Sequence, residues 1–298
     1  MAVTEMTAEV IAAKDRRIAW TAKLRDLIWR KPLGAAGAFV VLFFIGIAIF
    51  AELITVYDPV RISFESMHVP PGAAHWFGTD QFGRDILTRI VYGARTALFV
   101  GFAASIIGST AGLVLGVTSA YFGGRFDLIF QRIMDILISF PLIIMALTVV
   151  SIFGTGTQNV ILAITIPFIP RCARVVRSSA LAVREMPYVD AARTLGFNHK
   201  RIILRHMVPN VMAPFLIMLT TFMGQAILLE ASLSYLGLGV QEPTPAWGLM
   251  LQGGAEEYAE SAPWIPIFPG LAITAGVFAF NLLGDAVRDT LDPKLRSL

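Results

Sequence analysis

Residues 185–210 read EMPYVDAARTLGFNHKRIILRHMVPN, a polar and helix-forming passage with apolar stretches on both sides. The whole chain has 298 residues, of which 56% are hydrophobic and 15% are charged, and its mean hydropathy is +0.68. Because soluble domains carry about a quarter charged residues, this composition predicts an integral membrane protein. A polar passage of this length between membrane spans is typical of a face that contacts another protein.

The apolar stretches predict an all-α protein with six transmembrane helices, since a bilayer requires roughly 20 apolar residues per helix. We expect five spans near residues 33–55, 97–121, 128–153, 211–236 and 264–283. A further span begins near residue 159 and meets Pro167 and Pro170. Between the spans, residues 57–92 form a polar loop and residues 122–127 a tight turn.

The distribution of Lys and Arg predicts which loops lie in the cytoplasm, where these residues accumulate. Residues 1–32 contain seven of them and the stretch Arg171–Arg205 contains eight, whereas residues 57–92 contain three and residues 237–263 none. Both termini and the 185–210 loop are therefore expected inside. Residues 18–29 form either a helix in the membrane interface or part of a disordered tail.

These patterns divide the chain into four parts. Residues 1–32 are a basic cytoplasmic tail, and residues 33–95 are the first helix with its external loop. Residues 96–286 form the transmembrane core, which includes the loop 185–210, and residues 287–298 are a second cytoplasmic tail.

Small residues recur at every fourth position in the second span: Ala104, Gly108, Gly112, Gly116 and Ala120. This spacing places them close to one face of a helix, where another helix can approach backbone to backbone. We therefore expect a helix-packing role, with Gly108, Gly112 and Gly116 at its centre.

Polar residues inside the spans are candidates for a translocation path or a gate, and three stand out: Arg171, Gln225 and Glu230. From residue 159 to Arg171 a helix rises only about 18 Å, so Arg171 is expected within the inner half of a core roughly 30 Å thick. It either faces protein or a water-filled cavity, or extends to the headgroups. Glu230 is expected near the outer end of its span, at a gate or paired with a partner subunit.

Motifs for covalent chemistry are missing from the sequence. It contains no G-x-x-x-x-G-K-[ST], H-E-x-x-H or G-x-S-x-G. A single cysteine, Cys172, excludes an internal disulfide, and the four histidines lack the spacing of metal ligands. We expect no catalytic residue, no metal site and no cofactor on this chain.

Local signals predict two short helices in the 185–210 loop. Pro187 suits the first turn of a helix, and Gly196 can close that helix in a left-handed conformation. Asn198 can cap a second helix, which we expect to end before Pro209. A passive cytoplasmic loop is the alternative interpretation.

The loop resembles the EAA motif of bacterial ABC-importer permeases, E-A-A-x3-G-x9-I-x-L-P. Here Asp190-Ala191-Ala192 is followed after three residues by Gly196, and after nine more by H-x-V-P, which ends in Pro209. The chain departs from the motif at three positions, where it has Asp190 for Glu, His206 for Ile and Val208 for Leu.

Three further passages resemble the C-type permease subunit of dipeptide, oligopeptide and nickel ABC importers. They are HWFGTDQFGRDILTRIVYGARTAL (75–98), ASLSYLGLGVQEPTPAWG (231–248) and NLLGDAVRDTLDP (281–293). Their order and spacing fit this family from about residue 30 to the end of the chain.

The resemblance implies a type I ABC-importer permease fold in the bacterial cytoplasmic (inner) membrane. It implies a homologous B-type permease, two cytoplasmic subunits that bind ATP and Mg, and an external substrate-binding protein as partners, with membrane lipid and no nucleic acid. It assigns coupling to the ATPases to Asp190, Ala191, Ala192 and Gly196, with Pro209 fixing the return into the membrane.

The substrate implied by the resemblance is a dipeptide or oligopeptide. Nickel chelates, glutathione, opines and microcins remain alternatives within the same family. A different class, an ion-coupled secondary transporter, would use Asp135, Arg171 and Glu230 as an intramembrane charge relay.

Overall fold

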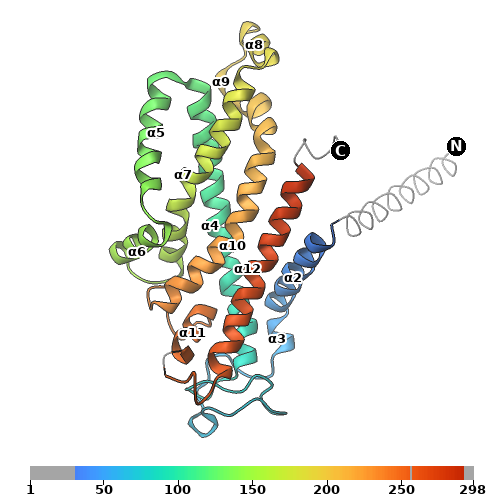
Figure 1. The fold of residues 1–298 in the computed structure, drawn as a ribbon, viewed down its shortest axis with the longest axis vertical. Helices are drawn as coiled ribbons and strands as arrows, with labels where there is room; N and C mark the ends of the chain where they lie inside the picture. Colours follow the sequence, from blue (N-terminus) through green and yellow to red (C-terminus); the bar gives the residue numbers. More distant parts are fainter. Residues whose placement is uncertain (1–30, 256, 292–298) are drawn as a thin grey trace, which may run out of the picture.

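The fold is described from a computed structural model that covers residues 31–255 and 257–291 (Figure 1). The helix expected at residues 18–29 lies outside these ranges. The described residues form nine α-helices of eight or more residues and two of four residues: α2 (Pro32–Ile49), α3 (Ala51–Ile54), α4 (Ile86–Phe122), α5 (Gly124–Ser139), α6 (Leu142–Phe153), α7 (Thr157–Arg184), α8 (Pro187–Thr194), α9 (His199–Ile202), α10 (Met212–Tyr235), α11 (Trp247–Ala255) and α12 (Trp264–Leu291).

The all-α membrane fold predicted from the sequence is confirmed. Among the described residues, five helical segments are long and apolar enough to cross a membrane: Pro32–Ile49, Ile86–Phe122, Thr157–Arg184, His199–Tyr235 and Trp264–Leu291. The pair α5 and α6 supplies a sixth span if it is counted as one. Most of these helices run along the long axis of the molecule (Figure 1).

The third predicted span, residues 128–153, is not one continuous helix. Its two halves, α5 and α6, are bent by 93° relative to each other, and Figure 1 shows α6 turned across the bundle. The break falls at Pro141, which has no N–H to donate. Phe140 before it has φ −82° and ψ 135°, the extended conformation that a following proline favours. A single proline thus changes the direction of the chain.

The second span begins eleven residues earlier than the sequence suggested, because α4 starts at Ile86 inside the stretch 57–92 expected to be a loop. The carboxylate of Asp85 caps the helix by accepting a hydrogen bond from the Thr88 N–H. With 37 residues, α4 is about 55 Å long, far more than the roughly 30 Å of a bilayer core. It therefore extends beyond the membrane core.

The other element boundaries also shift. The helix α7 continues through Pro167 and Pro170 to Arg184, and α12 extends the sixth span from residue 283 to Leu291. The loop 237–263 contains a short helix, α11, that the sequence did not predict. The two ends of the described chain lie together, since the Lys31 ammonium is 3.6 Å from the Asp289 carboxylate.

The small residues of α4 lie against α7. A Cβ on Gly108 would be 2.9 Å from the Phe168 Cβ, and one on Gly112 would be 2.5 Å from the Cys172 Cβ. At Gly116 it would lie 2.5 Å from the Ala173 carbonyl oxygen. These distances leave no space for a side chain, so the two backbones touch along several turns.

A second contact region lies where α2, α4, α11 and α12 meet around Trp247. This side chain is 1% exposed, and its indole N–H donates to the Ile90 carbonyl at 2.9 Å. Gly93 leaves room for the indole, since a Cβ there would be 2.7 Å from the ring. The tryptophan thus joins the short helix α11 to the N-terminal part of α4.

We predict that Gly112→Ala lowers the thermal unfolding midpoint of the detergent-solubilised protein. The added methyl group would overlap Cys172, and overpacking of this kind costs about 1–3 kcal/mol. Gly46→Ala in α2 is the matched control, because no atom lies within 4 Å of the added methyl group. Equal midpoints for the two variants would show that α4 and α7 do not pack as described.

Candidate functional site

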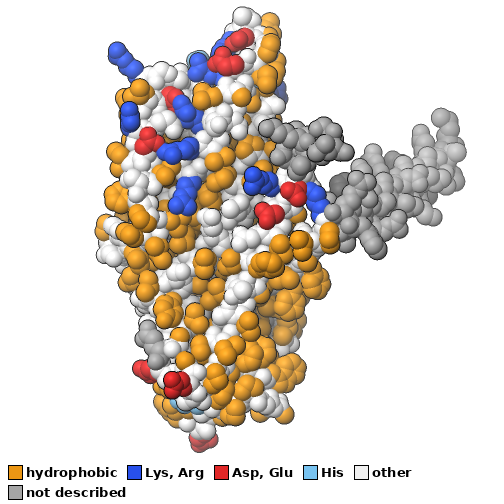
Figure 2. Space-filling view, viewed as in Figure 1, with side chains coloured by type: hydrophobic (Ala, Val, Ile, Leu, Met, Phe, Trp, Pro, Cys, Tyr) orange, Lys and Arg blue, Asp and Glu red, His pale blue; other side chains and the backbone are white. Residues whose placement is uncertain are grey.

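The helices α8 and α9 form the tip of one end of the molecule (Figure 1). On the face shown in Figure 2, Lys and Arg side chains gather toward this end together with several acidic ones, whereas acidic and histidine side chains but no Lys or Arg are visible at the opposite end. The loop 185–210 is therefore exposed and lies in the basic part of the surface. It is the first candidate for a functional surface.

The loop has two short helices joined at Gly196, as the sequence predicted. Gly196 has φ +74°, and its N–H donates to the Arg193 carbonyl while the Phe197 N–H donates to Ala192. This hydrogen-bond pattern closes α8 with a Schellman motif. The Asn198 side chain then accepts from the Arg201 N–H at 2.8 Å and caps α9. Each helix end at the bend is thus satisfied.

The expectation that the second helix ends before Pro209 is wrong. The backbone stays helical from α9 through a π turn (Ile203–Met207) and a 3-10 turn (Val208–Val211) into α10. The π turn changes the hydrogen-bond register just before Pro209, which lets the helix accommodate a residue without an N–H. Pro209 therefore lies within a continuous rod, and it is exposed.

The structure separates the two alanines that the family resemblance assigned to coupling. Ala192 is 3% exposed and belongs to the buried core together with Val189, whereas Ala191 is exposed. Asp190 is also exposed, and its carboxylate accepts a hydrogen bond from Arg193 at 3.0 Å. Asp190 and Ala191 are accessible to a partner, and Ala192 holds α8 against its own chain.

His206, which departs from the motif, lies between two aromatic rings that belong to the loop. The centroids of Tyr188 and Phe197 are each 6.2 Å from that of the imidazole, and Phe197 is nearly parallel to it. On Phe197, the Arg201 guanidinium lies 4.1 Å from the ring centroid. An aromatic imidazole can continue this stack, which an isoleucine could not.

Tyr121, near the end of α4, fastens the loop to the transmembrane helices. Its hydroxyl is 2.8 Å from Nδ1 of His199, the first residue of α9. The guanidinium of Arg193, in the last turn of α8, lies 5.4 Å from the centre of the Tyr121 ring. One side chain of α4 therefore contacts both short helices. Sequence reasoning missed it, because its partners are more than seventy residues away.

The three candidate path residues do not form one cluster. Glu230 is 1% exposed and its carboxylate accepts from the Ser234 hydroxyl at 2.7 Å, so it faces the interior of its own chain. Gln225 is half-buried in α10, and Arg171 is half-buried near the middle of α7. No hydrogen bond or ion pair joins any two of them in the described ranges. The sequence prediction of a partner-subunit contact for Glu230 gains no support from this position.

Ionic contacts instead fasten α5 to α7. Arg177 donates from Nε to the Asp127 carboxylate at 2.6 Å, and Arg174 pairs with Asp135. The helix α5 buries only Met134 among its residues, so these pairs are a main part of its attachment. Asp135 forms its ion pair with Arg174 and not with Arg171. It makes no contact with Glu230 among the described hydrogen bonds. The charge relay considered for an ion-coupled transporter is thus not assembled here.

A second ionic cluster lies at the end opposite α8. The Arg84 guanidinium is 2.7 Å from the Asp80 carboxylate and 2.8 Å from the Glu242 carboxylate. Arg89 is fully buried; its guanidinium is 3.3 Å from the Glu242 carboxylate and donates a hydrogen bond to the Pro59 carbonyl. These contacts join the loop before α4 to the loop after α10. The sequence counted both arginines only as external charges, because nothing local indicates their distant partner.

Metal-binding side chains do not cluster in the part of the chain that the structure describes, where no three of His, Cys, Asp and Glu could hold one ion. Cys172 is buried, and its Sγ lies 3.3 Å from the Ser109 carbonyl oxygen. The candidate site of the described chain is thus the capped surface loop 185–210 with the helices to which it is attached.

Residues 108–297 match the family described as "Binding-protein-dependent transport system inner membrane component". The Dipeptide transport system permease protein DppC of Alkalihalophilus pseudofirmus is 43% identical over 90% of this chain and 88% of its own. The Glutathione transport system permease protein GsiD of Pectobacterium atrosepticum is 40% identical over 98% of this chain and 96% of its own.

A solved structure has a similar fold. The inward-facing MetNI methionine ABC transporter includes a chain that aligns with a TM-score of 0.55 over 68% of this chain and 96% of its own. The two sequences are 19% identical, so this likeness concerns the fold alone.

We predict that Tyr121→Phe loosens the loop without unfolding the protein. The variant loses one hydrogen bond to His199, worth about 1 kcal/mol, and keeps the ring that Arg193 contacts. Amide hydrogen exchange in α8 and α9 should become roughly fivefold faster, as that energy implies. Tyr188→Phe is the control, since no hydrogen bond of its hydroxyl is found in the described residues. Unchanged exchange in Tyr121→Phe would contradict the proposed fastening.

Proposed function

The chain belongs to the family of binding-protein-dependent transport system inner membrane components, and we propose that it is one half of the pore of an ATP-driven peptide importer. The protein is a multi-pass permease of the inner membrane, as the family and its apolar helices indicate. The other half of the pore is a homologous permease. Two cytoplasmic ATP-binding subunits and an external substrate-binding protein complete the transporter.

The proposed orientation places α8 and α9 in the cytoplasm. Support comes from the distribution of charge, because eight Lys and Arg lie between Arg171 and Arg205 and none lies in residues 237–263. The sequence beyond the described ends adds six Lys and Arg in residues 1–30 and two in residues 292–298. The ionic cluster around Arg84 and Glu242 is then external.

The bent loop is the proposed site of coupling to the ATPases. The observation that carries this proposal is the rigid connection of α8 and α9: a closed bend at Gly196, a cap at Asn198, and the double contact with Tyr121. A rigid element transmits displacement, whereas a flexible loop would absorb it. Because α4 runs continuously from Tyr121 to the opposite end, movement of the loop would reach the external side.

Catalysis is not assigned to this chain in the proposed mechanism. ATP and Mg bind to the partner ATPases, and the permease converts their closure into a change in the tilt of its helices. The exposed side chains of α8, Asp190 and Ala191 among them, form the contact with the ATPase. The negative charge of Asp190 is favourable in the first turn of α8, where it interacts with the helix dipole. The next residue, Ala191, is small.

The proposed substrates are dipeptides, oligopeptides or related small molecules such as glutathione. Support comes from the names of the relatives, which include dipeptide and glutathione permeases at 40–43% identity over most of the chain. Uptake that depends on the ATPases is part of the same proposal. Accumulation of substrate after depletion of ATP would favour an ion-coupled transporter instead.

We predict that Ala191→Arg blocks transport while leaving the protein stable. Ala191 is exposed, so the large side chain obstructs the ATPase contact but costs the fold less than about 0.5 kcal/mol. The ATPases should no longer co-purify with the variant, and uptake of labelled dipeptide should fall at least tenfold. The same substitution at Ala259, an exposed position at the opposite end, is the control and should retain the ATPases.

The neighbouring Ala192 should behave differently. It is buried, so Ala192→Leu overpacks the core and lowers the unfolding midpoint, by the equivalent of about 1–3 kcal/mol.

Normal ATPase retention and uptake in Ala191→Arg would show that the exposed face of α8 is not the coupling surface.

A further inference from the structure

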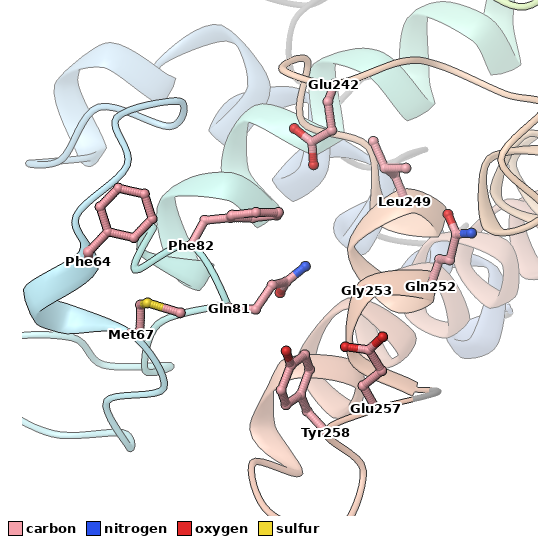
Figure 3. A pocket seen from close by; sticks show the side chains of 10 residues that line it. All are labelled: Phe64, Met67, Gln81, Phe82, Glu242, Leu249, Gln252, Gly253, Glu257 and Tyr258. Carbon is pink, nitrogen blue, oxygen red and sulfur yellow. The ribbon is translucent and has the colours of Figure 1, made fainter.

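A cavity of about 540 Å³ lies at the end opposite α8, between the loop that precedes α4 and the segment that contains α11. One wall consists of Phe64, Gln81 and Phe82, and the other includes Glu242, Glu257 and Tyr258 (Figure 3). Neither Lys nor Arg lines it. Its volume suits one or two large side chains or a small organic molecule.

The two walls of the cavity are fixed relative to each other by ion pairs. Glu242, on one wall, pairs with Arg84 and Arg89, which also approach Asp80 on the opposite side. The two walls are therefore joined by ion pairs between two buried arginines and Glu242, whose side chain is 43% exposed. Gly253 allows the amide of Gln81 to lie against α11, since a Cβ there would collide with it.

The charge of the cavity is negative. The two arginines balance Asp80 and Glu242, so the remaining charge is that of Glu257, which forms no ion pair within the described residues. Interaction with the neighbouring Glu257 carboxylate raises the pKa of the Tyr258 phenol. Figure 3 shows the carboxylates of Glu242 and Glu257 and the amide of Gln81 directed toward the same space.

Aromatic side chains complete the surface. Phe64 is 76% exposed and extends the aromatic wall of the cavity onto the surface. Phe82 and Tyr258 provide two further rings. Aromatic faces beside a carboxylate attract a cation through both charge and the ring quadrupole.

We propose that this cavity receives a basic side chain, Lys or Arg, of the external substrate-binding protein when it docks on the permease. The proposal rests on the proposed function, which places this end outside the cell. A protein side chain is favoured over free cargo because Phe64 extends the cavity wall onto the exposed surface, where a partner can cover it. Anchoring residues of this kind dominate many protein interfaces.

The test uses the assembled transporter in lipid nanodiscs and the purified binding protein of the same transport system. Glu257→Gln should weaken binding of that protein about fivefold at low salt, the range measured for a solvent-accessible ion pair, and the difference should shrink as salt is raised. Glu260→Gln removes an equal charge from an exposed position outside the cavity and should leave the affinity unchanged. Phe64→Ala, which removes an exposed ring, should also weaken binding.

The other outcomes identify what is wrong. Unchanged affinity in Glu257→Gln, or an equal loss in Glu260→Gln, overturns the cavity as the docking site. If Glu257→Gln instead releases the partner permease, or lowers uptake of lysine-containing dipeptides without changing binding of the binding protein, the cavity serves another ligand. If the unmodified transporter does not bind the protein at all, the proposed function itself fails.

Discussion

The close contact between α4 and α7 is the constraint on which the rest of the structure depends. Three glycines let the two backbones approach until a single methyl group would collide. Without a hydrophobic driving force between helices in lipid, such close packing is a main source of association. It also fixes α4, the longest helix, in the middle of the bundle. The loop 185–210 at one end and the segments around Trp247 at the other are both positioned relative to this pair.

The two ends are attached to α4 by different interactions. At one end, aromatic and cation–π contacts of Tyr121 position α8 and α9. At the other, Trp247 and the ionic cluster of Arg84 and Arg89 join loops that are about 150 residues apart in sequence. Hydrogen bonds and ion pairs form at the two ends of α4, whereas its middle packs against α7 through glycines. The helix α4 thus connects two surfaces that differ in their chemistry.

The fold class and the bend of the surface loop could be predicted because their signals are local. Apolar length indicates a span, Gly196 closes a helix, and Asn198 caps the next one. Predictions failed where the outcome depends on more distant atoms. Pro141 breaks its helix whereas Pro167, Pro170 and Pro209 are accommodated, so the residue type alone does not decide whether a helix ends.

The same distinction applies to the candidate site. Sequence by itself determined the membrane class, the EAA-like loop and the family resemblance, because composition and motif spacing are properties of the chain. Only the tertiary structure decided that Ala191 is exposed and Ala192 buried, that Tyr121 contacts both short helices, and that Glu230 faces its own chain. The physical reason is that burial and partnership are set by whichever helix packs against a residue, and that helix is distant in the sequence.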